Sequence, residues 1–301
     1  MQMLKIVGIN NSKYYDWKRR TGLANQHNGK VPKEHWLTPE ETQAIIDYAT
    51  MQIGANIYYT RDGYRRIAYN GIDLGLFATS PASVYRVLKE TGLLNRWSPK
   101  KTTSKGSGFN QPEYPHKDWH TDIKYVNYRG TFLFFISIID GYSRYIIHHE
   151  LRTSMTELDV QITLQKAYEK YPDTRPNIIS DNGGQYVSKE FGQYLKQLNF
   201  RHIRTSPNYP QSNGKIERFH RSLNEECLKK RSFIDLDDAR QQVALYIDKY
   251  NNIRLHSSLN YLRPVDYLKG NPKELLRQRQ KKLDDATMNR RNYWKAKNNV
   301  A

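Results

Sequence analysis

Aromatic and β-branched residues recur in three short runs in the middle of the chain, at residues 119–128, 131–139 and 144–151. Arg129-Gly130 separates the first run from the second, and Asp140-Gly141 separates the second from the third. Runs of this composition, joined by two-residue turns of this kind, are typical of β-hairpins. Three antiparallel strands in a meander are therefore predicted, and Asp140 is explained as a turn residue.

Helical and strand-like patterns alternate after the third run. The predicted elements are, in order, a helix at 156–171, a strand at 177–180, a helix at 188–198, a strand at 201–205 and a helix from about residue 214. Three meandering strands followed by this alternation give an α/β domain, in the element order of an RNase H-like fold, at residues 118–232. The pattern sets the order, whereas the pairing of the last two strands is a fold-level inference.

The first segment, residues 1–35, has the outline of a helix-turn-helix. A short helix from Leu4 leads to a turn that begins at Gly8, and a second helix follows, with Ser12 as its N-cap. This second helix ends in three cations, Lys18, Arg19 and Arg20. In such a unit the second helix lies in a DNA groove, which makes these cations candidate DNA contacts. A short basic amphipathic helix without that role looks the same, so both interpretations stay open.

Residues 36–95 form a second predicted helical unit. Thr38-Pro39, followed by two acidic residues, is typical of a helix start. Helices are predicted in this unit at about 38–52, 63–69 and 81–91. The third of them carries Arg86, a candidate DNA contact. Two helical units in tandem indicate recognition of an extended DNA site.

Residues 96–117 are rich in Ser, Thr, Pro, Gly and Lys and poor in aliphatic residues, which is typical of a linker. Lys100 and Lys101 in this linker are candidate contacts to DNA phosphates. A helical extension is predicted at the other end of the chain, at 233–301. Its last part, residues 271–301, contains nine Lys or Arg against three Asp or Glu. This basic tail is either a DNA-binding arm or a solvated helix.

Composition narrows the partners of this 301-residue chain. A net charge of +18 most simply serves a polyanion, and nucleic acid is the first candidate. A basic membrane-binding protein is the competing interpretation, but no stretch approaches the roughly 20 apolar residues that a spanning helix needs. The N-terminus lacks a secretory signal, so a cytoplasmic location is expected. The single cysteine, Cys227, excludes an intrachain disulfide and any zinc site that needs two cysteines.

Three acidic residues stand where an α/β domain places catalytic groups. Asp122 interrupts the first strand, Asp181 ends the strand at 177–180, and Glu217 lies in the first turns of the helix that begins near residue 214. A carboxylate within a core strand is costly unless it binds a cation or lies at an exposed edge. Carboxyl ends of strands are the usual place of sites in such domains. Three such groups can hold two Mg²⁺ ions about 3.5–4 Å apart, with Mn²⁺ as a substitute, which predicts metal-dependent phosphoryl transfer.

These acidic residues lie in three blocks, at residues 119–122, 180–186 and 206–223, that resemble the catalytic blocks of the retroviral integrase superfamily. Within the blocks, 35 residues separate Asp181 from Glu217. Residues 250–259, followed by Arg263-Pro264, resemble the segment that closes the integrase core of bacterial insertion-sequence transposases. The resemblance therefore implies a transposase with a catalytic triad of Asp122, Asp181 and Glu217.

The N-terminal half is similar to the same transposases, in their second-reading-frame type, through blocks at residues 7–17, 63–67 and 84–90. The resemblance covers roughly residues 3–268. It implies a dimer or higher assembly on double-stranded DNA that cuts at terminal inverted repeats and uses the freed 3′-hydroxyl to join target DNA. It also implies a bacterial cytoplasm, with the nucleoid as the location of the DNA-bound protein. No leucine-zipper heptads are present, so the chain either acts alone or works with the product of an upstream reading frame.

The resemblance also points to DNA contacts around Glu217. Many relatives have a basic residue two helical turns after the catalytic Glu, where this chain has Asn224, and Arg218 and Arg221 are the available cations. Arg221 shares the helix face of Glu217 and is either a grip on a terminal phosphate or an ordinary surface residue. The approach to the helix holds three further candidates, where related enzymes contact DNA near the cut: Gln211, Asn213 and Lys215.

Two other functions remain as alternatives. A nuclease of RNase H type that cleaves without joining would use the same metal site, but it would leave the helical units and the basic tail without a purpose. A domesticated DNA-binding protein would use only its helical units. The presence of all three carboxylates argues against that second alternative.

Overall fold

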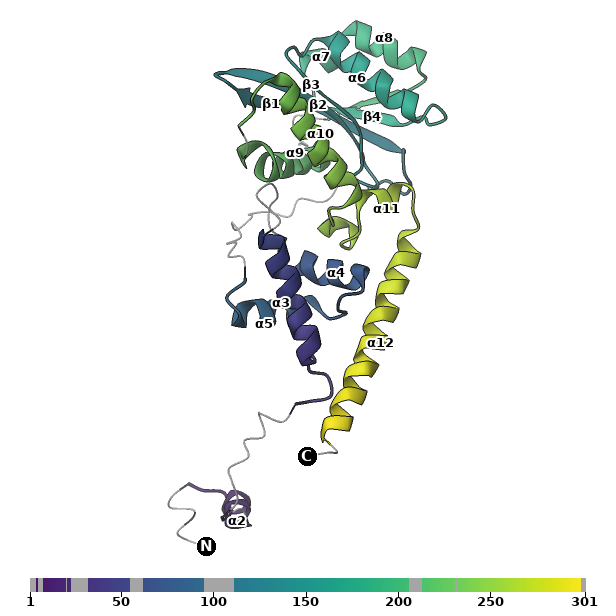
Figure 1. Ribbon diagram of the computed structural model, residues 1–301. Coiled ribbons are helices and arrows are strands. Elements are labelled where there is room, and N and C mark those ends of the chain that lie inside the picture. The colour runs from purple at the N-terminus through teal and green to yellow at the C-terminus, as the bar shows by residue number, and fades with distance from the viewer. Residues whose placement is uncertain are drawn as a thin grey trace.

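The computed structural model describes residues 4, 8–19, 21–22, 32–54, 62–94, 111–205, 213–230 and 232–298. Figure 1 shows an α/β domain at one end of these residues and a helical unit below it. A long C-terminal helix runs from the α/β domain along the side of the helical unit (Figure 1). Within the described residues, no helix combines the length and the apolar character that crossing a membrane requires.

The α/β domain is built on one five-stranded sheet. Its strands are β1 (Asp118–Tyr128), β2 (Thr131–Asp140), β3 (Ile146–Arg152), β4 (Asn177–Ser180) and β5 (Arg201–Arg204), in the spatial order β3-β2-β1-β4-β5. β2 pairs antiparallel with both β1 and β3, which confirms the meander. The structure also settles the last two pairings, because β4 runs parallel to β1 and β5 runs parallel to β4. The predicted RNase H-like α/β fold is confirmed.

The turn between β1 and β2 follows from its sequence. Arg129 and Gly130 have φ angles of 47° and 80°, the left-handed values that a two-residue hairpin turn of this kind requires. Asp140, which ends β2, is fully buried and accepts hydrogen bonds from the backbone N–H and the hydroxyl of Ser143. It also accepts one from the backbone N–H of His116, at 2.7 Å. The interpretation of Asp140 as a turn residue is confirmed.

Helices cover both faces of the sheet. The first face packs against α6 (Glu157–Lys170) and α8 (Lys189–Gln197), and the short helix α7 (Gly184–Val187) precedes α8. The other face packs against α9 (Gly214–Glu226) and α10 (Leu236–Asn252). Successive side chains of a strand point to opposite faces, and in β2 Phe135 belongs to the α9 side while Ile136 belongs to the α6 side. The hydrophobic core on this second face holds α9, with Glu217 in its first turn, against the sheet.

The second helical unit has a hydrophobic core of its own. It consists of α3 (Pro39–Gly54), α4 (Tyr64–Leu74) and α5 (Pro81–Glu90). Ile45 from α3, Ile67 from α4 and Val84 from α5 lie in this core. α4 extends five residues beyond its predicted end, through Gly71, because the absence of a side chain there leaves room for the ring of Phe77. The predicted unit of three helices is present, with that one boundary corrected.

The N-terminal helix α2 (Asn11–Arg19) has no buried residue. Its start differs from the prediction, because the side chain of Asn10 accepts the hydrogen bond from the backbone N–H of Ser12, at 3.1 Å. Asn10 therefore takes the capping role, and Ser12 already lies inside the helix. The helix predicted before it falls almost wholly outside the described residues.

The C-terminal extension is helical, as predicted, and its last part packs on the helical unit. After η2 (Leu228–Lys230) and α10 come η3 (Ser257–Leu259), α11 (Pro264–Leu268) and the 27-residue helix α12 (Pro272–Asn298). Arg279, Arg290 and Trp294 are buried on one face of α12. The indole N–H of Trp294 donates to the backbone carbonyl of Trp36, at 2.9 Å. The basic tail is thus a helix packed along one face against the helical unit and not a fully solvated helix, whereas its role as a DNA-binding arm stays a prediction.

Candidate active site

Two of the three predicted catalytic carboxylates lie at matching positions on neighbouring strands. Every register pair of β1 and β4 joins residues 59 positions apart, from Asp118 with Asn177 to His120 with Ile179. Asp122 and Asp181 are also 59 positions apart, each two residues beyond that last pair. Neighbouring strands are about 4.8 Å apart. The parallel pairing therefore brings these two carboxylates to one level of the sheet, where β1 and β4 separate.

Asp122 is held by contacts from its own strand and from α9. Its Oδ1 accepts a hydrogen bond from the backbone N–H of Ile123, at 2.9 Å. Its Oδ2 lies 3.4 Å from Nδ1 of His220, a buried residue of α9. The other ring nitrogen of His220 lies 3.0 Å from the hydroxyl of Ser137 on β2. His220 was not among the residues predicted from the sequence, although its place three residues after Glu217, on the same helix face, could have indicated it.

Asp181 is exposed, and its position is fixed by the turn that follows β4. Its Oδ1 accepts a hydrogen bond from the backbone N–H of Gly183, at 2.9 Å. The nearby phenol of Tyr186 is buried and lies 3.2 Å from the hydroxyl of Thr121. Burial raises the pKa of Tyr186, and the charges of Asp122 and Asp181 raise it further. The phenol of Tyr186 therefore lies close enough to both carboxylates for their charges to affect it, which agrees with their placement at one level of the sheet.

Glu217 lies in the first turn of α9 and is exposed. Ile216 and Phe219 beside it are buried in the core between α9 and the sheet. His220, one helical turn later, contacts Asp122, so the helix face that carries Glu217 is turned towards the aspartates. Within the described ranges, however, no three acidic, His or Cys side chains are gathered closely enough to hold a metal ion. The structure thus aligns the acidic elements without forming a complete metal centre.

The chemistry of these side chains nevertheless fits a hard divalent cation. All three predicted ligands are carboxylates, and oxygen ligands suit Mg²⁺, Mn²⁺ and Ca²⁺. Asp122 lies on β1, Asp181 directly follows the neighbouring strand β4, and Glu217 lies on a helix that the hydrogen bond between His220 and Ser137 ties to the sheet. These residues fit the magnesium site that the sequence predicts.

Two predicted DNA contacts point into the protein. The amide of Asn213 is buried and donates to the backbone carbonyl of Thr121, at 3.5 Å. The ammonium group of Lys215 is also buried. Burial and the charge of Arg144 lower the pKa of Lys215 to about 8, although Asp118 and Asp140 oppose this shift. The first turn of α9 packs on β1, so these side chains anchor the helix and do not present their polar groups at the surface.

The other predicted DNA contacts divide into two groups. Five of them are exposed on helices: Lys18, Arg19, Arg86, Arg218 and Arg221. Of these, Arg19 forms a surface ion pair with Asp16, at 3.4 Å. The remaining four lie outside the described residues: Arg20, Lys100, Lys101 and Gln211.

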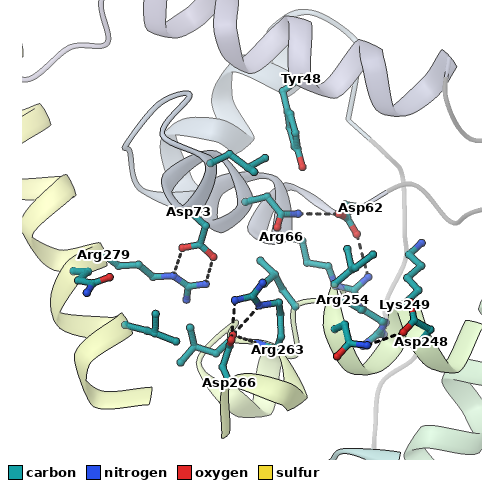
Figure 2. A pocket seen from close by; sticks show the side chains of 18 of the residues that line it. Tyr48, Asp62, Arg66, Asp73, Asp248, Lys249, Arg254, Arg263, Asp266 and Arg279 are labelled. Atoms are coloured by element: carbon teal, nitrogen blue, oxygen red, sulfur yellow. Dashed lines mark hydrogen bonds and ion pairs between the residues drawn. The ribbon is translucent and has the colours of Figure 1, made fainter. Parts of the chain in front are cut away.

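A cavity of about 660 Å³ lies between the helical unit and the core, and ion pairs line it (Figure 2). Glu226, at the end of α9, pairs with Arg254 at 2.6 Å and lies 3.8 Å from Arg66 of α4. Burial opposes ionisation of Glu226, but the hydrogen bonds and charge of Arg254 hold its pKa below the ordinary value. Asp122, Asp181 and Glu217 do not line this cavity. It is therefore a charged interface at the far end of the helix that carries Glu217.

Comparisons with known proteins identify the kind of domain that contains the five-stranded sheet. Two models described as "Integrase core domain" match the chain, one over residues 112–210 and the other over residues 198–264. Together these ranges contain all five strands and all three predicted catalytic residues. The fold and the candidate site define an integrase core.

Similar curated proteins are insertion-sequence transposases. The transposase for insertion sequence element IS904 of Lactococcus lactis is 27% identical over 188 residues, which cover 59% of this chain and 74% of that protein. The transposase InsF for insertion sequence IS3A of Escherichia coli is 31% identical over 155 residues, which cover 51% of this chain and 54% of InsF. The chain thus spans about half of InsF. The chain contains an integrase core domain over residues 112–264 and is similar to insertion-sequence transposases.

Solved structures with related folds are retroviral integrases. The simian T-cell lymphotropic virus intasome, in complex with PP2A regulatory subunit B56 gamma, is 18% identical, with a TM-score of 0.48 over 73% of each chain. The HTLV-2 integrase catalytic core domain in complex with magnesium is 16% identical, with a TM-score of 0.42 over 52% of this chain and 97% of that one.

Proposed function

We propose that the protein catalyses metal-dependent cleavage at the 3′ ends of a mobile DNA element and joins those ends to target DNA. The observation that carries this proposal is the common level of Asp122 and Asp181 in the sheet, next to the helix of Glu217. Three carboxylates on two strands and one helix are the ligand arrangement that two Mg²⁺ ions need. The integrase-core matches over residues 112–264 support it.

In this proposal Asp122, Asp181 and Glu217 hold the metal. When bound, two divalent ions would increase the nucleophilicity of the attacking oxygen and stabilise the leaving 3′-oxygen. The protein's own part is to orient the carboxylates. The turn at Gly183 holds Asp181, the contact with His220 holds Asp122, and the packing of α9 holds Glu217.

The proposed partner is double-stranded DNA, both the terminal inverted repeats and the target. The charge of +18 supports a polyanionic partner, and the exposed cations on α2, α5 and α9 supply phosphate contacts. A dimer or higher assembly on DNA, with or without the product of an upstream reading frame, belongs to this proposal. So does a location on the bacterial nucleoid.

The test is cleavage and joining of labelled DNA that carries the ends of the element, with Mg²⁺ and with Mn²⁺. We expect Glu217→Gln to abolish both steps while DNA binding persists, because the change removes a metal ligand and leaves the cations in place. Glu225→Gln is the matched control, since Glu225 is an exposed carboxylate of the same helix that forms a surface ion pair with Lys229. Cleavage without joining would indicate a nuclease, and activity that persists in Glu217→Gln would refute the proposed site.

A further inference from the structure

His220 of α9 contacts one of the predicted metal ligands, Asp122. Its ring is buried between Ser137 of β2 and Asp122 of β1, at 3.0 Å and 3.4 Å. Ser137 and Asp122 are direct register partners in the antiparallel pair, so both side chains project to the same face of the sheet. α9 lies over that face and inserts the imidazole between them.

The two ring nitrogens of His220 face different partners, Asp122 and Ser137. Nδ1 of His220 faces the carboxylate of Asp122, and because an ionised carboxylate only accepts hydrogen bonds, a proton on this nitrogen favours the contact. Nε2 of His220 lies 3.0 Å from the hydroxyl of Ser137, which can donate a hydrogen bond to this nitrogen or accept one from it. Ser137 is fully buried. A hydroxyl with no access to solvent thus orients the ring that contacts the carboxylate.

The packing around the ring restricts its motion. The rings of Phe135 and His220 are 6.0 Å apart between centroids in an edge-to-face arrangement, and Phe219 lies 5.7 Å away. A ring held by a hydrogen bond on one side and by aromatic contacts on others has few other rotamers. It therefore restricts the rotation of Asp122, whose other oxygen accepts from the backbone of Ile123.

We propose that His220 is a positioning residue, which orients the carboxylate of Asp122 for metal binding and sets the distance between β1 and the helix of Glu217. This inference rests on the proposed function, because it takes Asp122 and Glu217 as metal ligands. His220 acts only through Asp122 and the docking of α9. Residues that orient a ligand in this way commonly change metal affinity by about 10- to 100-fold when they are replaced.

The experiment measures Mn²⁺ binding to the full chain, without DNA, by electron paramagnetic resonance or titration calorimetry, together with thermal unfolding of the metal-free protein. His220→Leu and His220→Asn are a matched pair, because Leu and Asn have similar size and only Asn offers an N–H near the place of Nδ1. We expect His220→Leu to weaken Mn²⁺ binding by at least about tenfold. His220→Asn should recover most of that loss. Ser222→Ala, elsewhere on α9, is the control.

Equal Mn²⁺ affinity in the parent and in His220→Leu would overturn the inference. Equal weakening in the Leu and Asn variants would also overturn it, because it would show that only the bulk of the ring matters. If His220→Leu does not fold, Ser137→Ala tests the inference instead. Loss of the Ser137 hydroxyl should leave the protein folded and weaken Mn²⁺ binding by a smaller factor than the one expected for His220→Leu. Unchanged binding in Ser137→Ala would then refute the positioning role.

A comparison with Glu217→Gln separates this inference from the proposed function. If the parent binds Mn²⁺ no better than Glu217→Gln, the proposed metal site fails and the role of His220 fails with it. If Glu217→Gln loses binding while both His220 variants retain the parent affinity, the metal site stands and only the role of His220 is refuted.

Discussion

Arg290 of the C-terminal helix and Glu41 of α3, 249 positions apart, form a two-pronged ion pair at 2.7 Å and 2.8 Å. Arg290 is buried, and it also donates to the backbone carbonyl of Ala78. Arg279, further up the same helix, pairs in the same way with Asp73 of α4, at 2.7 Å and 2.6 Å. Through Arg279 and Arg290, α12 is attached to α4 and α3 of the second helical unit.

Loss of the pair between Arg290 and Glu41 should destabilise the protein strongly. Arg290→Ala leaves a partly buried carboxylate without its partner, which typically costs about 3–5 kcal/mol in the free energy of unfolding. Arg291→Ala, next to it, removes a half-exposed pair with Glu34 and should cost about 0–1 kcal/mol. Chemical denaturation measures both. Similar losses in the two variants would show that burial does not distinguish the two ion pairs.

Alanine should have opposite effects at two helical glycines. A Cβ at Gly71 would come within 2.2 Å of the ring of Phe77, whereas a Cβ at Gly192 of α8 meets nothing within 4 Å. Gly192→Ala should therefore stabilise the protein by about 0.4–1 kcal/mol. Gly71→Ala should destabilise it by about 1–3 kcal/mol, as overpacking does. Thermal unfolding of both variants tests this difference, and a gain in stability at Gly71 would contradict the close contact.

DNA binding should separate Lys215 from the exposed cations of the same helix. Arg221→Gln should weaken DNA binding and reduce the dependence of the affinity on salt concentration by about one unit of log–log slope. Lys215→Gln should leave this slope unchanged, because its ammonium is buried and does not face the DNA. Titrations of labelled DNA at several salt concentrations provide the measurement. A reduced slope for Lys215→Gln would show that the residue reaches DNA after all.

Acid should destabilise the protein through two adjacent histidines on β3. Burial lowers the pKa of His148 and of His149 to about 4, and neighbouring positive charge adds to both shifts. Between pH 6.5 and about 4 the unfolded chain therefore binds more protons than the folded one, so the free energy of unfolding falls as the pH decreases through this range. His149→Gln should make this dependence shallower. Denaturation at a series of pH values would contradict the expectation if the parent and the variant had the same slope.

Much of the core could be predicted from local patterns. The three meandering strands, the turn at Arg129-Gly130 and the strand that precedes Asp181 all appear where the pattern of aromatic, β-branched and turn residues placed them. Asp122 and Asp181 followed from the same reasoning, because their places relative to strands are readable from the sequence. Their common level in the sheet was not readable, since it depends on the parallel pairing of β1 with β4.

The directions in which side chains near the site point could not be predicted from the neighbouring sequence. Asn213 and Lys215 stand in a polar approach that suggests a surface, yet both polar groups are buried because the first turn of α9 packs on β1. His220 had no local signal beyond its spacing from Glu217. Its partners come from two strands that lie more than 80 positions earlier in the chain.

The sequence by itself determined the elements of this protein, the order in which they follow and the residues that carry charge and metal-binding oxygen atoms. Periodicity, caps and turns act over a few neighbouring residues, so they are legible without the fold. Only the tertiary structure decided that Arg290 meets Glu41, that His220 meets Asp122 and that Lys215 points inwards. Such contacts depend on how distant segments pack, and packing is a property of the whole folded chain.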